Sequence, residues 1–77
     1  MHEFARKLKA KTDAGAALCI DNELWACPRW RISKHAISIY DKGGATTLRL
    51  MERGDDPAEV EADLRERIRV YVPVEIN

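Results

Sequence analysis

The chain has 77 residues, of which 45% are hydrophobic and 34% are charged, with 13 basic and 13 acidic side chains. This length allows one domain, residues 1–77, and the composition is typical of a folded globular protein. A net charge of zero argues against a dedicated nucleic-acid binder, whose domain is usually strongly basic. The charges are unevenly distributed, however, because residues 1–49 sum to +4 and residues 50–77 to −4.

The N-terminus and the cysteines bear on the cellular location. No apolar run approaches the roughly 20 residues of a membrane span, and the opening sequence MHEFARKLKAK lacks the apolar region of a signal peptide. The spacing of Cys19 and Cys27 is typical neither of a disulfide framework nor of a zinc site. We therefore expect a cytoplasmic protein without membrane, metal or cofactor, in which both cysteines are small buried packing residues.

Residues 3–11, EFARKLKAK, fit two interpretations. As a helix they place Phe4 and Leu8 on one face, and as a strand they add Arg6 and Ala10 to the same side. The helix is favoured because Ala, Lys, Arg and Leu are good helix formers.

Residues 14–27 fit either a hairpin or a helix. In the hairpin, two short strands are joined by Asp21 and Asn22, which both tolerate positive φ. The helix is weakened by Gly15 and by the position of Asp21 on its apolar face. Pro28 ends either element.

The segment 35–51, HAISIYDKGGATTLRLM, predicts a β-hairpin. Ile37 and Ile39 recur at period two, and the sequence DKGG supplies the turn. Both strands then present one apolar face to a core. A tight turn predicts the cross-strand pairs Tyr40–Ala45, Ile39–Thr46, Ile37–Leu48 and His35–Leu50.

Trp30 and Ile32 predict a preceding strand, because they alternate with arginines. Their phase changes before Ile37, which either a bulge or a two-residue turn at residues 33–34 would explain. With the turn, Ile32 faces His35 on the core side of the sheet.

The clearest helix is predicted over about Pro57 to Arg69. Asp56 is a good N-cap, followed by proline at the first helical position and glutamate at the third. Its apolar stripe, which would cover the sheet, consists of Val60, Leu64 and Ile68. Two i, i+4 ion pairs, Glu61–Arg65 and Asp63–Arg67, would support the helix.

The last residues predict a strand, because Val70, Val72, Val74 and Ile76 alternate with other residues. Pro73 cannot donate to a ladder, so this strand should lie at a sheet edge or pair only on the side away from the proline nitrogen. Such an edge could pair with another chain, so we expect a monomer or a homodimer.

These elements predict an α+β fold. We expect an antiparallel β-meander of three to five strands with the C-terminal α-helix packed on one face and a final C-terminal strand. A short N-terminal helix completes the fold if residues 3–11 are helical.

Residues suited to catalysis are few. The two histidines are His2, near the terminus, and His35, on the predicted core side, and no nucleophile elbow or phosphate-binding loop is present. Asp55 and Asp56 are explained by the helix start. We therefore expect a protein that is not an enzyme.

The sheet face opposite the helix is the principal candidate binding surface. We expect it to display Arg29, Arg31, Ala36, Ser38, Tyr40, Thr47 and Arg49. Arginine and tyrosine are enriched in protein interfaces, which favours a protein-interaction module acting as an inhibitor, adaptor or regulator. The partner-binding residues would be Arg29, Arg31, Tyr40 and Arg49.

The alternative is a nucleic-acid-binding module. It would use the basic N-terminal segment together with arginines of the open sheet face. Its residues would be Arg6, Lys7, Lys9, Lys11, Arg31 and Lys34.

The order of elements in RWRISKHAISIYDKGGATTLRLM and then DDPAEVEADLRERI resembles the arm-type DNA-binding domain of phage integrases, over about half the chain. That resemblance implies DNA binding. In size and style, without a shared residue motif, the chain also resembles the small inhibitors and regulators encoded by phages and mobile elements, anti-CRISPR proteins among them. This second resemblance implies an inhibitor that binds another protein.

Overall fold

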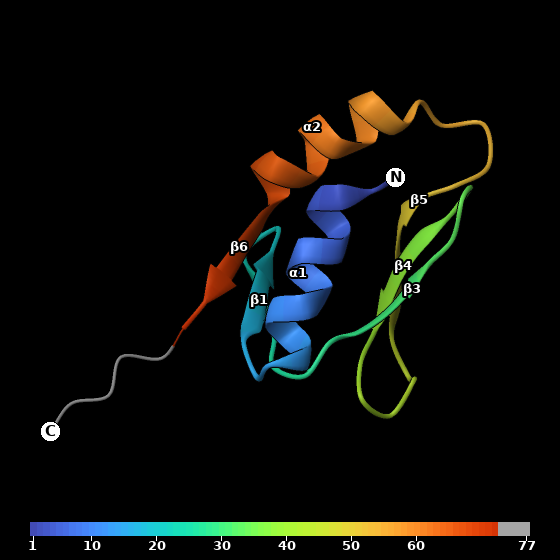
Figure 1. Ribbon diagram of the computed structural model, residues 1–77. Helices are drawn as coiled ribbons and strands as arrows, with labels where there is room; N and C mark the ends of the chain where they lie inside the picture. Colours follow the sequence, from blue (N-terminus) through green and yellow to red (C-terminus); the bar gives the residue numbers. More distant parts are fainter. Residues whose placement is uncertain (73–77) are drawn as a thin grey trace, which may run out of the picture.

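The computed structural model describes residues 1–72, which contain two helices and six strands. The predicted α+β class is confirmed (Figure 1). No helix in this range is long and apolar enough to cross a membrane. The elements in chain order are α1 (Glu3–Asp13), β1 (Ala17–Ile20), β2 (Glu23–Trp25), β3 (Arg29–Ile32), β4 (Ile37–Tyr40), β5 (Thr47–Met51), α2 (Pro57–Arg67) and β6 (Ile68–Tyr71).

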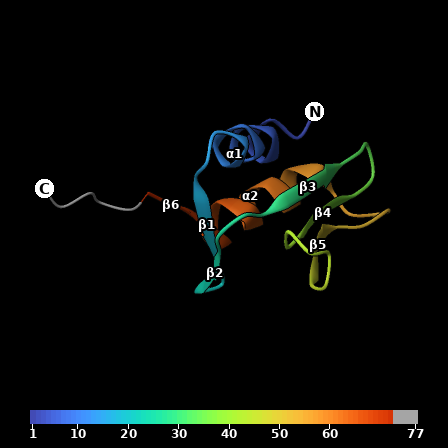
Figure 2. The same ribbon diagram turned by 90° about the horizontal axis from the view of Figure 1, so that it is seen from below.

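The strands form two antiparallel sheets, ordered β2-β1-β6 and β3-β4-β5. The second is the predicted meander, and the C-terminal strand joins the first sheet, beside β1 (Figure 1). Both sheets lie on the same side of α1 (Figure 2). Helix α1 packs on β3 and α2, and α2 also packs on β5 and β6.

One hydrophobic core is shared by both sheets and both helices. The buried indole of Trp30 donates a hydrogen bond of 3.1 Å to Thr12 Oγ1, which satisfies its only polar atom. The core consists of Ala5, Leu8, Leu18, Ile20, Trp30, Ile37, Ile39, Leu50, Met51, Leu64 and Ile68.

The favoured alternatives for the first 27 residues are confirmed. Residues 3–13 are helical, with Ala5 and Leu8 buried and Phe4 packed against the core. The next segment is the hairpin, because Asp21 and Asn22 adopt φ values of 51° and 69° between β1 and β2. Both values are those of a two-residue turn whose twist matches the strands.

The predicted cross-strand registers of the meander are wrong by two residues. Tyr40 pairs with Thr47, and Ile32 pairs with Ile37. The β3–β4 loop, residues 33–36, is longer than the expected two-residue turn, and the β4–β5 loop, residues 41–46, is longer than the expected four-residue turn. The Asp41 carboxylate accepts a hydrogen bond of 2.8 Å from the Ala45 backbone N–H and closes the longer loop.

A shift of two residues leaves each side chain on its predicted face, so the apolar set still faces the core. The exception is His35, which lies exposed in the turn before β4 and not on the core side. A register irregularity between Ile37 and Ser38 sets Ile37 opposite Met51, and both Leu50 and Met51 are buried.

Helix α2 begins as predicted and ends two residues early. The Asp56 carboxylate accepts a hydrogen bond of 3.0 Å from the Ala58 N–H. Ile68 has extended backbone angles and pairs with Ile20 of β1, so the chain passes directly from helix to strand. The two predicted ion pairs are confirmed, at 3.2 Å each, and are Glu61–Arg65 and Asp63–Arg67.

Strand β6 begins and ends earlier than predicted, although it is an edge strand as expected. Val72 lies beyond it and is 70% exposed. The predicted positions at Pro73, Val74 and Ile76 lie outside the described residues.

The cysteines differ from the expectation of two buried residues. Cys19 is half-buried on β1, whereas Cys27 is exposed in the loop before β3. Both are free thiols.

Candidate binding face

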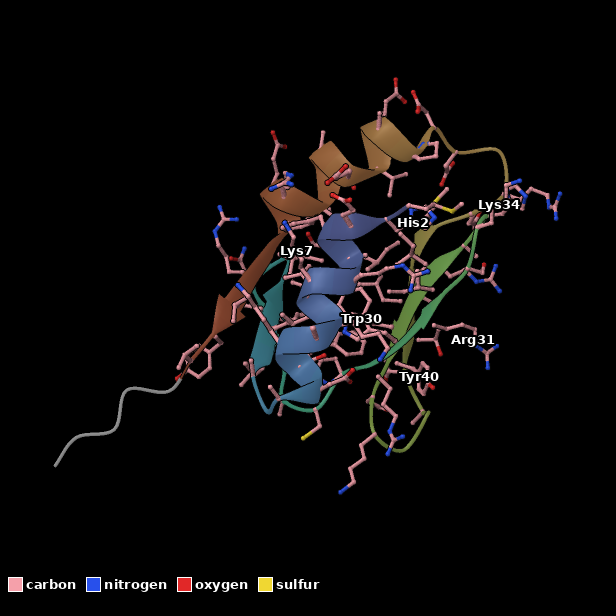
Figure 3. The ribbon with its side chains drawn as sticks, viewed as in Figure 1. His2, Lys7, Trp30, Arg31, Lys34 and Tyr40 are labelled. Atoms are coloured by element: carbon pink, nitrogen blue, oxygen red, sulfur yellow. The ribbon has the colours of Figure 1, made fainter. Side chains whose placement is uncertain are left out.

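The side of the β3-β4-β5 sheet away from the helices carries the principal candidate site, which we call the open face. Trp30, Ile37 and Ile39 are buried on the helix side, so the residues that alternate with them point outward. Figure 3 shows Arg31 projecting from the sheet on the side away from α1. The open face consists of Arg29, Arg31, Ser38, Tyr40, Thr47 and Arg49.

The sheet register arranges the open face in two rows, each crossing three strands. One row is Arg29–Tyr40–Thr47, and the other is Arg31–Ser38–Arg49. The four predicted partner-binding residues therefore lie in adjacent rows of one surface. Ala36, also expected there, lies in the turn before β4 and outside these rows.

A shallow hollow of about 380 Å³ opens on this face. Its walls carry guanidinium and hydroxyl groups, and none of its lining residues is acidic. The lining residues are Arg31, Ser38, Tyr40, Gly44, Thr47 and Arg49.

The arginines of the open face are only weakly neutralised. Arg49 Nη1 lies 3.4 Å from Glu52 Oε1, and both side chains are mostly exposed. Such surface pairs contribute about 0–1 kcal/mol. Arg29 and Arg31 form no ion pair with any other residue of the range 1–72. The face therefore presents positive charge to a partner.

A second hollow, also of about 380 Å³, adjoins the first at Tyr40, which lines both. It brings Lys9 of α1 and Lys42 of the β4–β5 loop close to Arg29. Sequence reasoning did not group Lys9 and Lys42 with Arg29, because only the packing of α1 on the meander joins them.

The residues of the nucleic-acid alternative are divided between α1 and the meander. Four of its six members lie on α1, which covers the side of the meander opposite the open face. Lys7 and Arg31 project in different directions (Figure 3). Lys34 lies in the turn before β4, where its carbonyl oxygen is 3.2 Å from His2 Nε2.

Two further features bear on ligand and metal binding. A pocket of about 230 Å³ lies between the N-terminal ends of α1 and α2, with Ile37, Leu64 and Glu61 among its lining residues. Within residues 1–72, no cluster of three or more His, Cys, Asp or Glu side chains is placed to hold a metal ion.

Comparisons of the chain with protein-family models, curated proteins and solved structures found no match. A functional interpretation therefore depends on the geometry and chemistry of the chain itself.

Proposed function

We propose that the protein is a non-enzymatic protein-interaction module that binds a partner through the open face. It would act as an inhibitor, adaptor or regulator by occupying the partner's surface. The observation that carries the proposal is the pair of rows that place three arginines and a tyrosine on one uncovered sheet face.

The composition of this face suits protein recognition. Arginine and tyrosine are enriched among the residues that dominate binding energy in interfaces, because both combine apolar contact area with directed hydrogen bonds. Strands hold these side chains, so little conformational freedom of the backbone is lost on binding. Two arginines without an ion-pair partner among residues 1–72 favour an acidic partner surface.

A triple variant, Arg31→Ala/Tyr40→Ala/Arg49→Ala, tests the proposal. All three side chains lie on the open face, outside the core, so the variant should keep its fold and its melting temperature within a few degrees. Affinity capture from native lysate, quantified by mass spectrometry, should show specific proteins lost about tenfold or more with the variant.

The matched control is Lys7→Ala/Lys11→Ala, which removes the same number of positive charges from exposed positions of α1. Capture should be unchanged with this control. Equal capture by the triple variant and the unaltered protein would contradict the assignment of the open face.

Nucleic-acid binding is the second candidate function. It is favoured by the second hollow, which Arg29 and Lys42 line together with Tyr40, because cations beside an aromatic ring suit a single strand. Lys9 also lines this hollow, but its charge is paired with Asp13 at 2.6 Å. Binding to random DNA, measured at low and at physiological salt, separates the two candidates. The nucleic-acid function would be favoured if the affinity for DNA falls steeply with salt and the triple variant no longer binds DNA.

A further inference from the structure

The row Arg31–Ser38–Arg49 has the geometry of a two-armed clamp. Arg31 on β3 and Arg49 on β5 both stand opposite Ser38 on the central strand. Neighbouring strands lie about 4.8 Å apart, so the Cα atoms of the two arginines are separated by roughly 10 Å. Two extended arginine side chains span this distance and can meet at one group placed above Ser38.

The hollow around this row is lined by basic and hydroxyl side chains and by no acidic one. Besides the two guanidinium groups it contains the hydroxyl groups of Ser38, Tyr40 and Thr47, all of which can donate hydrogen bonds. No carboxylate side chain lines it. Two guanidinium groups with hydroxyl donors beside them therefore favour a bound group that has negative charge and several acceptor oxygen atoms.

We propose that this hollow binds the phosphate monoester of a phosphorylated side chain on a protein partner. A phosphate monoester carries about −1.5 to −2 charge and three acceptor oxygens, which matches two guanidinium groups and a central hydroxyl. A carboxylate or a nucleic-acid phosphodiester has less charge and fewer free oxygens for the same donors. The inference rests on the proposed function, because it names the chemistry that the open face recognises.

Glu52 should weaken phosphate binding, because it pairs with one of the two arginines. Its carboxylate, 3.4 Å from Arg49 Nη1, lies outside the hollow and competes for one arm of the clamp. A dianion that contacts both arginines displaces this exposed ion pair. Removing the Glu52 charge should therefore strengthen phosphate binding, whereas removing either arginine should weaken it.

The test is an NMR titration of the 77-residue protein with O-phospho-L-serine, with dimethyl phosphate and acetate as comparison ligands. We expect saturable shifts at the backbone amides of Arg31, Ser38 and Arg49, strongest with the monoester. Glu52→Gln should tighten binding about twofold to fivefold. Arg31→Gln/Arg49→Gln should abolish it, and Arg31→Lys should weaken it because lysine lacks the bidentate fork.

Three results would overturn the inference: equal affinity for the diester or for acetate, shifts located elsewhere, or no gain in affinity with Glu52→Gln. Phosphatase treatment of the lysate separates it from the proposed function. If capture survives dephosphorylation but is lost in the triple variant, the open face binds protein and the phosphate inference is wrong. If the triple variant captures as well as the unaltered protein, the proposed function itself is wrong.

Discussion

Arg67, at the end of α2, binds two carboxylates from different parts of the chain. Its Nη2 and Nε donate to Asp21 at 2.8 and 3.1 Å, and its Nη1 donates to Asp63 at 3.2 Å. The backbone adds a further bond, in which the Asp21 N–H donates to the Arg67 carbonyl oxygen at 3.1 Å. These contacts join the β1–β2 turn to the end of α2, although Asp21 and Arg67 are 46 positions apart in the sequence.

The same contacts set the protonation of both groups. The hydrogen bonds from Arg67 lower the pKa of the Asp21 carboxyl below its ordinary value of about 3.8, against a smaller opposing effect of desolvation. The hydrogen bonds to the carboxylates raise the already high pKa of Arg67. Because the folded-state pKa of Asp21 is depressed, its contribution to stability is present above the unfolded value and is lost as the pH falls through the folded value.

We predict that Asp21→Asn lowers the unfolding midpoint in urea near pH 7. Asparagine also tolerates the left-handed φ of 51° at this position, so the turn is preserved and only the charge is removed. The difference between variant and unaltered protein should shrink as the pH falls below about 3.8. Urea unfolding across this range measures it.

Asp13→Asn is the control, because the ion pair of Asp13, at 2.6 Å from Lys9 Nζ, lies within α1. It should change the urea midpoint less than Asp21→Asn at neutral pH. A deficit of Asp21→Asn that persists undiminished in acid would show that the turn conformation, and not the ion pair, is responsible.

At the scale of the elements, α2 contacts both sheets and contributes one buried side chain, Leu64, to the core. Leu64 is 1% exposed, and its helix contacts α1, β5 and β6. A guanidinium–aromatic contact, Arg65 at 4.4 Å from the centre of the Phe4 ring, joins α2 to α1 on the outside. The helix therefore fills the space between elements that are far apart in the sequence.

We predict that Leu64→Ala lowers the free energy of unfolding by about 2–5 kcal/mol, the usual cost of truncating a buried leucine. In a domain this small that is enough to leave a large unfolded fraction at room temperature. Glu66→Ala, an exposed position on the same helix, should change it by less than about 0.5 kcal/mol. Similar losses for the two variants in urea unfolding would show that α2 does not organise the core.

At the scale of the whole molecule, β6 brings the last described element back to β1, the first strand of the chain. It follows α2 without a loop and pairs with β1, so that Val70 stands opposite the fully buried Leu18. Its other edge has no partner strand within residues 1–72. Tyr71, the last residue of β6, is 50% exposed.

We predict that deleting residues 70–77 unfolds the protein, because the deletion removes half of β6 and uncovers Leu18. Circular dichroism and light scattering provide the measurement, and a truncation of residues 73–77 alone is the control for the tail. A folded monomer produced from a dimer by the longer deletion would instead identify β6 as a subunit interface. A truncated protein that stays folded with unchanged mass would refute both expectations.

Most individual elements could be predicted from the sequence, because their signals act over a few neighbouring residues. Asp56 and Pro57 start α2 through backbone angles and a local hydrogen bond, and Asp21 with Asn22 forms a two-residue turn for similar reasons. Membership of the open face was also predictable, except for Ala36, which lies in the turn before β4. It follows from period two along each strand, which survives a register error of two residues.

Only the tertiary structure decided how these elements meet. Loop closure through Asp41 set the register, and pairing of Ile68 with Ile20 ended α2 two residues before its helical pattern does. The packing of α1 on β3 brought Lys9 to Arg29, and the meander register placed Arg31 and Arg49 on either side of Ser38. Such contacts join residues far apart in the chain, and their free energy depends on the core that all elements share, which no local pattern encodes.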